Sequence, residues 1–272
     1  MRIALILSLT IIFPFLALTQ SPEIEKAVIE TGQLQELRLK SMFEANRDSV
    51  FEVFQTSFDR LIGLDSKVND TLFTSNDYFR VDLPSEKMAG EDLMYSFVGS
   101  IVVSNSRDGK LRFFSSDNLD GGSWHNYTNH YQSFSSDKDL VSKAAEMETY
   151  KPTDDELDAG IYNVEQFDFQ NSTYYLTFGY GTEGAGNHHH LVKAYTLEED
   201  SIVNQNLFSL AARIDIISKR FQQANLTYDE KKGTISYSEF EETYIEETGE
   251  YTYKKRTVSW IFEDGQFVKS SL

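Results

Sequence analysis

The sequence predicts an α+β protein in which an N-terminal helical segment packs on a mainly antiparallel β-sheet or sandwich with a short helical insertion. Three observations indicate this class. Apolar residues recur with a helical period up to residue 62, and after about residue 78 apolar and polar residues alternate with a period of two. Turn signals such as Asp264-Gly265 separate the alternating stretches, which predicts successive hairpins.

The composition excludes several classes of protein. The 272 residues contain no cysteine, which excludes a disulfide scaffold, a zinc finger and a catalytic thiol. A formal net charge of −18 argues against a nucleic-acid partner, because phosphate contacts need a basic face. Hydrophobic residues make up 40 % of the chain, which is enough to build a core. An acidic globular protein remains.

Residues 1–19 have the pattern of a secretory signal peptide. Arg2 precedes an apolar run over residues 3–18, and small residues stand at the −3 and −1 positions of a cleavage site between Thr19 and Gln20. The run is shorter than the ~20 residues that a spanning helix needs. We therefore expect no transmembrane segment in the mature chain and export to the periplasm or the exterior. Export without cysteine favours a bacterial protein.

Residues 20–77 are predicted to be helical, and residues 78–272 to form the β-rich region of the same compact domain. The Ser-Pro-Glu sequence at Ser21 is typical of a helix start. Residues 23–62 contain no proline and one glycine, which favours one long helix or two shorter ones that end near Gly63. One face of a 3.6-residue repeat carries the apolar stripe Phe43, Val50, Phe51, Phe54, Phe58, Leu61 and Ile62. We expect this stripe to pack on the sheet.

Eight later stretches have the composition of strands, and two segments interrupt them. The predicted strands are 96–104, 110–115, 161–169, 173–180, 191–197, 234–240, 251–262 and 266–269. Residues 137–150 have helical composition and are the expected insertion. Residues 207–217 suit a second short helix, although 213–218 would also suit a strand.

All five histidines fall in two windows, one with His125 and His130 and one with His188, His189 and His190. Neutral imidazole is the commonest ligand for zinc, copper or nickel, and such an ion needs three or four donors at one point. On a strand His188 and His190 share a face while His189 points away. A divalent metal site would therefore need His125 and His130 to meet His188 and His190 in space. The alternative is a solvated histidine run at a loop–strand junction.

Aromatic residues accompany the histidines in both windows. Trp124, Tyr127 and Tyr131 lie in the first window and Tyr180 in the second. Exposed aromatic rings beside planar polar groups suit glycan or peptide ligands, so these four residues are a candidate binding face. The alternative is that they fill the core of a sheet rich in Tyr and Phe.

Two stretches of the sequence have a pattern of their own. The first is Ser106-Arg-Asp-Gly-Lys-Leu-Arg-Phe-Phe-Ser-Ser-Asp117, followed by Gly121-Gly-Ser-Trp-His125 and Tyr131-Gln132. The second is Thr173-Tyr-Tyr-Leu-Thr-Phe-Gly-Tyr-Gly181. Both resemble a group of exported proteins of Bacteroidetes that have no assigned activity. The chain departs from the group's pattern at Trp124 and at the histidine run. The resemblance implies export and a β-rich fold, and it transfers no catalytic residue.

Together these features favour an exported, non-catalytic binding or envelope-associated protein. Its recognition face is predicted on the loops around residues 124–131 and 179–190. One alternative is a hydrolase that acts on polysaccharide or peptide through a histidine-bound metal. Another is a structural partner that docks through its amphipathic helix. A Walker loop, a Gly-x-Ser-x-Gly elbow and a His-Glu-x-x-His helix are all absent from the sequence, so no catalytic residue is indicated.

Overall fold

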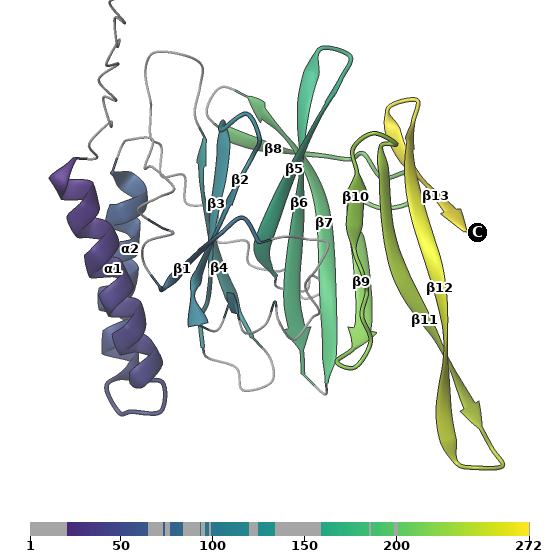
Figure 1. Cartoon of the computed structure of the whole chain (residues 1–272), viewed down its shortest axis with the longest axis horizontal. Helices are drawn as coiled ribbons and strands as arrows, with labels where there is room; N and C mark the ends of the chain where they lie inside the picture. The colour runs from purple at the N-terminus through teal and green to yellow at the C-terminus, as the bar shows by residue number, and fades with distance from the viewer. Residues whose placement is uncertain are drawn as a thin grey trace, which may run out of the picture.

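Among the residues that the structure describes, two long helices and three sheets form four successive layers in a computed structural model of the chain (Figure 1). The structure describes residues 21–64, 73, 77–83, 93, 96–97, 99–119, 125–133, 159–184, 186–198 and 201–271. The helices come first, followed by sheet A, sheet B and sheet C, and the predicted α+β class is confirmed. The predicted signal peptide and the predicted helical insertion at 137–150 lie outside the described residues. Within the described residues no helix is long and apolar enough to span a membrane.

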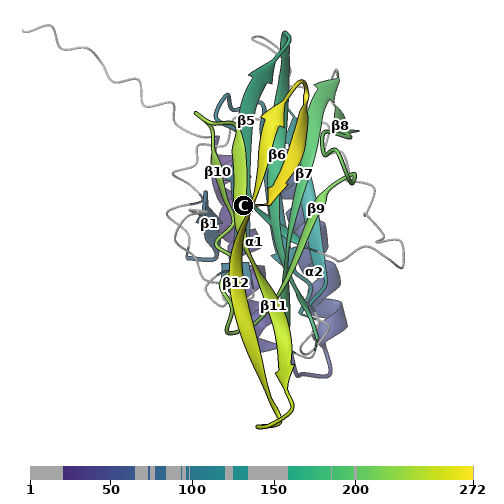
Figure 2. The ribbon, with the colours of Figure 1, turned by 90° about the vertical axis from the view of Figure 1, so that its right-hand side faces the viewer.

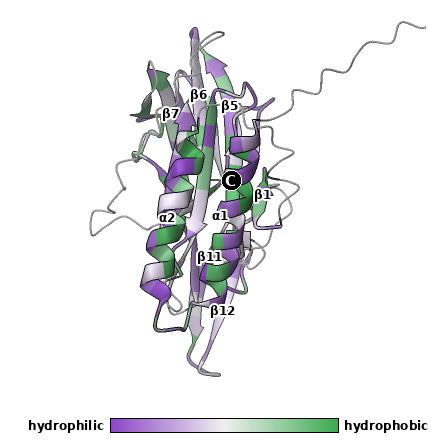
Figure 3. Ribbon diagram, turned by 90° about the vertical axis from the view of Figure 1, so that its left-hand side faces the viewer, coloured by the Kyte–Doolittle hydropathy of each residue, from purple (hydrophilic) through white to green (hydrophobic). Residues whose placement is uncertain are grey.

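The helical layer consists of α1 (Pro22–Lys40) and α2 (Arg47–Gly63), so the segment forms two helices rather than one. Figure 3 looks onto these helices, which run side by side and carry both hydrophilic and hydrophobic bands. The predicted stripe is buried at Val50, Phe54, Phe58, Leu61 and Ile62. Phe43 lies in the turn between the helices and is 91 % exposed. Phe54, Phe58, Leu61 and Ile62 of the stripe pack on α1 and on one face of sheet A, as expected from the sequence.

Sheet A has the strand order β1-β2-β3-β4. Its strands are β1 (Phe79–Val81), β2 (Ile101–Asn105), β3 (Leu111–Asp117) and β4 (Tyr127–Ser133), and only β1 pairs in parallel with its neighbour β2. The side chain of Gln132 on β4 donates a 2.6 Å hydrogen bond to the carbonyl oxygen of Ile62, which ties the sheet to the end of α2. On the helix side Phe58 contacts Phe114 and His130 edge to face.

Sheet B contains β5 (Gly160–Phe169), β6 (Ser172–Glu183), β7 (Asn187–Glu198), β8 (Ser201–Gln205) and β9 (Ile214–Lys219), with β7 paired to β6, β8 and β9. Both of its faces are covered. Tyr175 on one face packs with Leu111 and Phe113 of sheet A. Phe178 and Val192 on the other face belong to the core that includes sheet C. Burial on β7 is therefore nearly continuous along the strand.

Sheet C has the order β10-β11-β12-β13, with β10 (Thr227–Asp229), β11 (Thr234–Ile245), β12 (Glu250–Glu263) and β13 (Gln266–Ser271). Its buried side chains Ile235, Tyr237, Val258 and Trp260 face sheet B. The predicted turn at Asp264-Gly265 has positive φ at both residues, 49° and 89°, as a two-residue hairpin of type I′ requires. Figures 1 and 2 show the β11–β12 hairpin extending beyond the other strands.

Three sequence-based expectations differ from the structure. The helix predicted at 207–217 is wrong, because residues 214–219 form strand β9, which pairs with β7. The alternative prediction of a strand at 213–218 differs from β9 by one residue at each end. The predicted strand at 96–104 begins only at Ile101, and residues 96, 97 and 99 are helical. Strands β1, β4, β8 and β10 were not predicted, because their short and polar sequences lack a clear alternation.

We expect Phe58→Ala to lower the free energy of unfolding by about 3–5 kcal/mol, because it leaves a cavity between α2 and sheet A. Phe58 is fully buried, whereas Phe43 is 91 % exposed on the same helical segment and is a matched control. Phe43→Ala should change the free energy of unfolding by less than about 0.5 kcal/mol. Urea denaturation followed by circular dichroism measures both. Equal effects of the two substitutions would contradict the packing of α2 on sheet A.

Candidate functional site

Strands β6 and β7 pair along only part of their length. Their register runs from Glu183 opposite Asn187 to Tyr175 opposite Tyr195. Beyond that point residues 172–174 of β6 pair only with β5, and residues 196–198 of β7 pair only with β8. One end of sheet B is therefore split between its two central strands.

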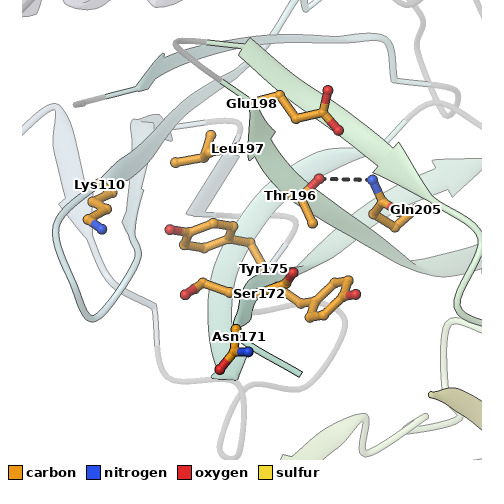
Figure 4. A pocket seen from close by; sticks show the side chains of 10 residues that line it. Lys110, Asn171, Ser172, Tyr175, Thr196, Leu197, Glu198 and Gln205 are labelled. Carbon is orange, nitrogen blue, oxygen red and sulfur yellow. Dashed lines mark hydrogen bonds between the residues drawn. The ribbon is translucent and has the colours of Figure 1, made fainter. Parts of the chain in front are cut away.

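A cleft of about 440 Å³ lies at this split. Its lining residues are Lys110, Asn171, Ser172, Thr173, Tyr174, Tyr175, Thr196, Leu197, Glu198 and Gln205. Figure 4 shows the labelled side chains of β6 and the preceding turn facing those of β7 and β8, with Lys110 to one side. Most of these side chains carry a hydroxyl, an amide or a charge, so the cleft is a polar one.

The backbone adds further polar groups to the cleft. Successive residues of an antiparallel strand direct their N–H and C=O groups to opposite neighbours. The gap between the strands therefore receives the backbone N–H and C=O groups of at least one residue from 172–174 and of at least one from 196–198. A ligand in the cleft can use these donors and acceptors in addition to the side chains.

Tyr175 forms the rigid base of the cleft. Its side chain is 1 % exposed, and its hydroxyl donates a 2.9 Å hydrogen bond to Oδ2 of Asp108 in the β2–β3 hairpin. The backbone N–H of Asp108 in turn donates to Oε1 of Gln166 at 3.0 Å. Burial, and then the Asp108 carboxylate, raise the pKa of Tyr175, so the phenol stays protonated. These bonds fix the base of the cleft to sheet A.

The walls of the cleft hold hydrogen-bonding side chains, with one charged side chain of each sign at the margin. Nε2 of Gln205 donates a 2.8 Å hydrogen bond to Oγ1 of Thr196, as Figure 4 shows. Lys110 and Glu198 are exposed at its margin. Among the ten lining residues Glu198 is the one carboxylate, and there is no histidine or cysteine. The lining therefore supplies both hydrogen-bond donors and hydrogen-bond acceptors, and its one lysine is balanced by one glutamate.

The aromatic residues expected to bind a ligand have other positions. Tyr127, Tyr131 and Tyr180 are 7 %, 5 % and 0 % exposed. They fill the core, which was the alternative to the predicted binding face. The physical reason is that residues 127–133 form strand β4, whose Tyr127 and Tyr131 point toward sheet B. Trp124 lies outside the described residues.

The four candidate metal ligands are not brought to one point. His125 lies beside Asp117, with 2.6 Å between Nδ1 and Oδ2. His130 faces α2 from sheet A, whereas His188 and His190 pack on the ring of Tyr180 on the far side of sheet B. Sheets A and B therefore separate His130 from His188 and His190. The described residues contain no group of three or more His, Asp or Glu side chains placed to hold a metal ion.

The histidine run is buried and not solvated. His188, His189 and His190 are 0 %, 2 % and 5 % exposed, because β7 begins at Asn187 and has a sheet on either side. Burial lowers the pKa of His188 to about 4, with a smaller contribution from the positive charge of Arg220, and it lowers the pKa of His190 to about 3. Both imidazoles are neutral at pH 7. Among the described residues neither ring nitrogen of His188 has a hydrogen-bond partner.

Sequence reasoning did not identify the cleft, because it forms where two strands separate and no sequence pattern marks the end of a strand pair. The fold brings Lys110 and residues 173–175, which are far apart in the chain, to the same end of sheet B.

Comparison with known proteins gives no matching family model, no matching curated protein and no matching solved structure.

The buried histidines predict a loss of stability in mild acid. The unfolded chain binds protons at the ordinary pKa of about 6.5, whereas folded His188 and His190 stay neutral down to about 4 and about 3. The free energy of unfolding should therefore fall as the pH drops below about 6.5, by up to about 1.4 kcal/mol per pH unit for each histidine. Urea denaturation between pH 7.5 and 5 measures the slope, in a range where ordinary carboxylates stay ionised.

His188→Leu is the matched variant for this experiment, because it replaces one titrating imidazole by an apolar side chain of similar size. Its free energy of unfolding should depend less steeply on pH than that of the wild type. A wild-type stability that is constant from pH 6.5 to 5 would contradict the neutral, buried state of these histidines.

Proposed function

We propose that the protein is an exported, non-catalytic binding protein whose ligand occupies the cleft between β6 and β7. The cleft at the split end of sheet B is the observation that carries the proposal. Its base is held rigidly by the hydrogen bond from Tyr175 to Asp108, so the polar groups around it are positioned before a ligand arrives. The predicted signal peptide and the resemblance to exported proteins of Bacteroidetes support the export part of the proposal.

The ligand class that suits this lining is a neutral glycan. Thr196 and Gln205 on one wall and Ser172 and Thr173 on the other offer hydroxyl and amide groups that match the hydroxyls of a sugar. The ring of Tyr174 is partly exposed and gives an apolar surface of the kind that sugar rings pack on. One lysine and one glutamate at the margin give no strong preference for a charged ligand. A peptide is the second ligand class, which the backbone groups of the cleft would also accommodate.

Binding is favoured over catalysis by the chemistry of the lining. Hydrolysis of a glycosidic bond uses two carboxyl groups on opposite sides of that bond. Glu198 is the single carboxylate among the lining residues, and the carboxylate of Asp108 is already engaged by Tyr175 beneath them. The cleft thus supports recognition of a ligand by hydrogen bonds and packing.

Isothermal titration calorimetry against a panel of neutral oligosaccharides and peptides tests the proposal. We expect a neutral oligosaccharide to bind and Gln205→Leu to weaken that binding by roughly tenfold, because one amide partner is lost. Asn204→Ala is the matched control, since Asn204 is exposed on the same strand and does not line the cleft. It should leave the affinity unchanged.

Two results would overturn the proposal. One is the absence of binding to every oligosaccharide and peptide in the panel. The other is a ligand whose affinity is the same for wild type and for Gln205→Leu, which would place its site elsewhere. If a peptide binds, and Gln205→Leu weakens that binding, the cleft remains the binding site and the ligand class is a peptide instead of a glycan.

A further inference from the structure

The distal part of the β11–β12 hairpin lies outside the three-sheet body. Residues 241–245 of β11 pair with residues 250–254 of β12, whereas β13 pairs with β12 only from Val258 onward and β10 pairs with β11 only as far as Ser236. Figures 1 and 2 show this segment projecting past the ends of the neighbouring strands. Both edges of the segment are therefore unpaired, and all of its residues except Ile245 and Tyr253 are exposed.

One face of the segment is aromatic. Tyr244 stands opposite Tyr251. Tyr253 lies on the same face two residues further along β12, and Phe240 four residues further along β11. Phe221, which follows β9, completes the group through an edge-to-face contact with Tyr253 at 5.3 Å between ring centroids. We call these five residues the aromatic face.

The aromatic face exposes far more apolar surface than the core strands of the same sheet. Phe221, Tyr244 and Tyr251 are 69 %, 52 % and 57 % exposed, whereas Val258 and Trp260 nearer the body are 1 % and 4 % exposed. The Tyr244 and Tyr251 rings also contact each other, at 5.0 Å between centroids. Rings held in this way lose little conformational freedom when a partner binds, which favours their use in recognition.

The charge around the aromatic face identifies the partner that it fits. Residues 242–252 contain Glu242, Glu246, Glu247 and Glu250 and no lysine or arginine, and Lys255, opposite Phe240, is the one cation that the strand register places on the aromatic face. On the opposite face, nearer the body of the protein, Arg256 pairs with Glu239 at 2.5 Å. The end of the hairpin therefore combines stacked phenol rings with an excess of negative charge.

We propose that the aromatic face docks a polypeptide segment rich in lysine and arginine. Cationic side chains bind over tyrosine rings through cation–π attraction and pair with the surrounding carboxylates, so one partner satisfies both features. A second copy would bring the glutamates of one hairpin against those of the other, and an anionic lipid surface would meet the same repulsion. The site is separate from the cleft at β6 and β7, and it does not depend on what that cleft binds.

Fluorescence anisotropy of a labelled oligolysine peptide at low ionic strength tests the proposal with the full chain. We expect Tyr244→Ser/Tyr251→Ser to weaken binding by roughly fivefold or more, because two cation–π contacts are lost while every charge is kept. Glu246→Gln/Glu247→Gln should weaken binding to a similar extent, and added salt should weaken it further. Tyr244→Phe/Tyr251→Phe keeps the rings and should retain the wild-type affinity, which separates loss of the rings from misfolding.

Matched controls come from the helical layer at the opposite end of the molecule. Glu25→Gln/Glu52→Gln makes the same change in net charge at exposed sites, and Phe43→Ser removes an exposed ring. Both controls should bind oligolysine as the wild type does. Equal weakening by Glu25→Gln/Glu52→Gln and by the hairpin glutamate pair would overturn the proposal, because attraction to overall charge would then explain the binding.

Two further results would also overturn it. One is binding to vesicles of phosphatidylglycerol that is lost in Tyr244→Ser/Tyr251→Ser, which would make a lipid surface the partner. The other is concentration-dependent dimerisation in sedimentation that the same variant abolishes, which would make a second copy the partner.

Discussion

Sheet B has a packed layer on each of its faces, and most other features of the structure depend on that constraint. Tyr175 packs toward sheet A on one side, and Phe178 and Val192 pack toward sheet C on the other. Apolar area removed from water on both faces gives a large part of the hydrophobic stabilisation of the chain. The helices then need only to cover the remaining face of sheet A, which they do through Phe54 and Phe58.

The same constraint controls the chemistry of the polar residues on β7. A strand that is buried on both faces cannot hold an ionised imidazole without a partner, so His188 and His190 are neutral. The constraint ends where β6 and β7 separate. Beyond Tyr175 and Tyr195 the strands no longer pair, and polar side chains such as Thr196 and Gln205 reach solvent in a cleft. The candidate binding site is thus the place where the buried sheet opens.

Local patterns identified much of the fold. The apolar period around Phe54 and Phe58 predicts a helix with one buried face, and the Asp264-Gly265 pair predicts a tight hairpin, because both signals act over a few residues. The strands at the edges of the sheets were harder to predict from the sequence. Strand β4 has the sequence Tyr-Thr-Asn-His-Tyr-Gln-Ser, whose polar residues become acceptable inside the protein only because α2 and β3 supply partners, such as the carbonyl oxygen of Ile62 for Gln132. The cleft was the hardest feature to predict, since it depends on where the pairing of β6 with β7 stops.

The sequence by itself determined the class of fold, the acidic and cysteine-free character, the helical stripe and the positions of most hairpin turns. Each of these depends on residue type and on spacing within one segment. Only the tertiary structure decided which faces are buried, and this placed Tyr127, Tyr131, Tyr180 and the histidine run in the core. Burial of a strand is a property of the layers on either side of it, which come from distant parts of the chain. A period of two shows that a strand has two faces, but it does not show whether one or both of them are covered.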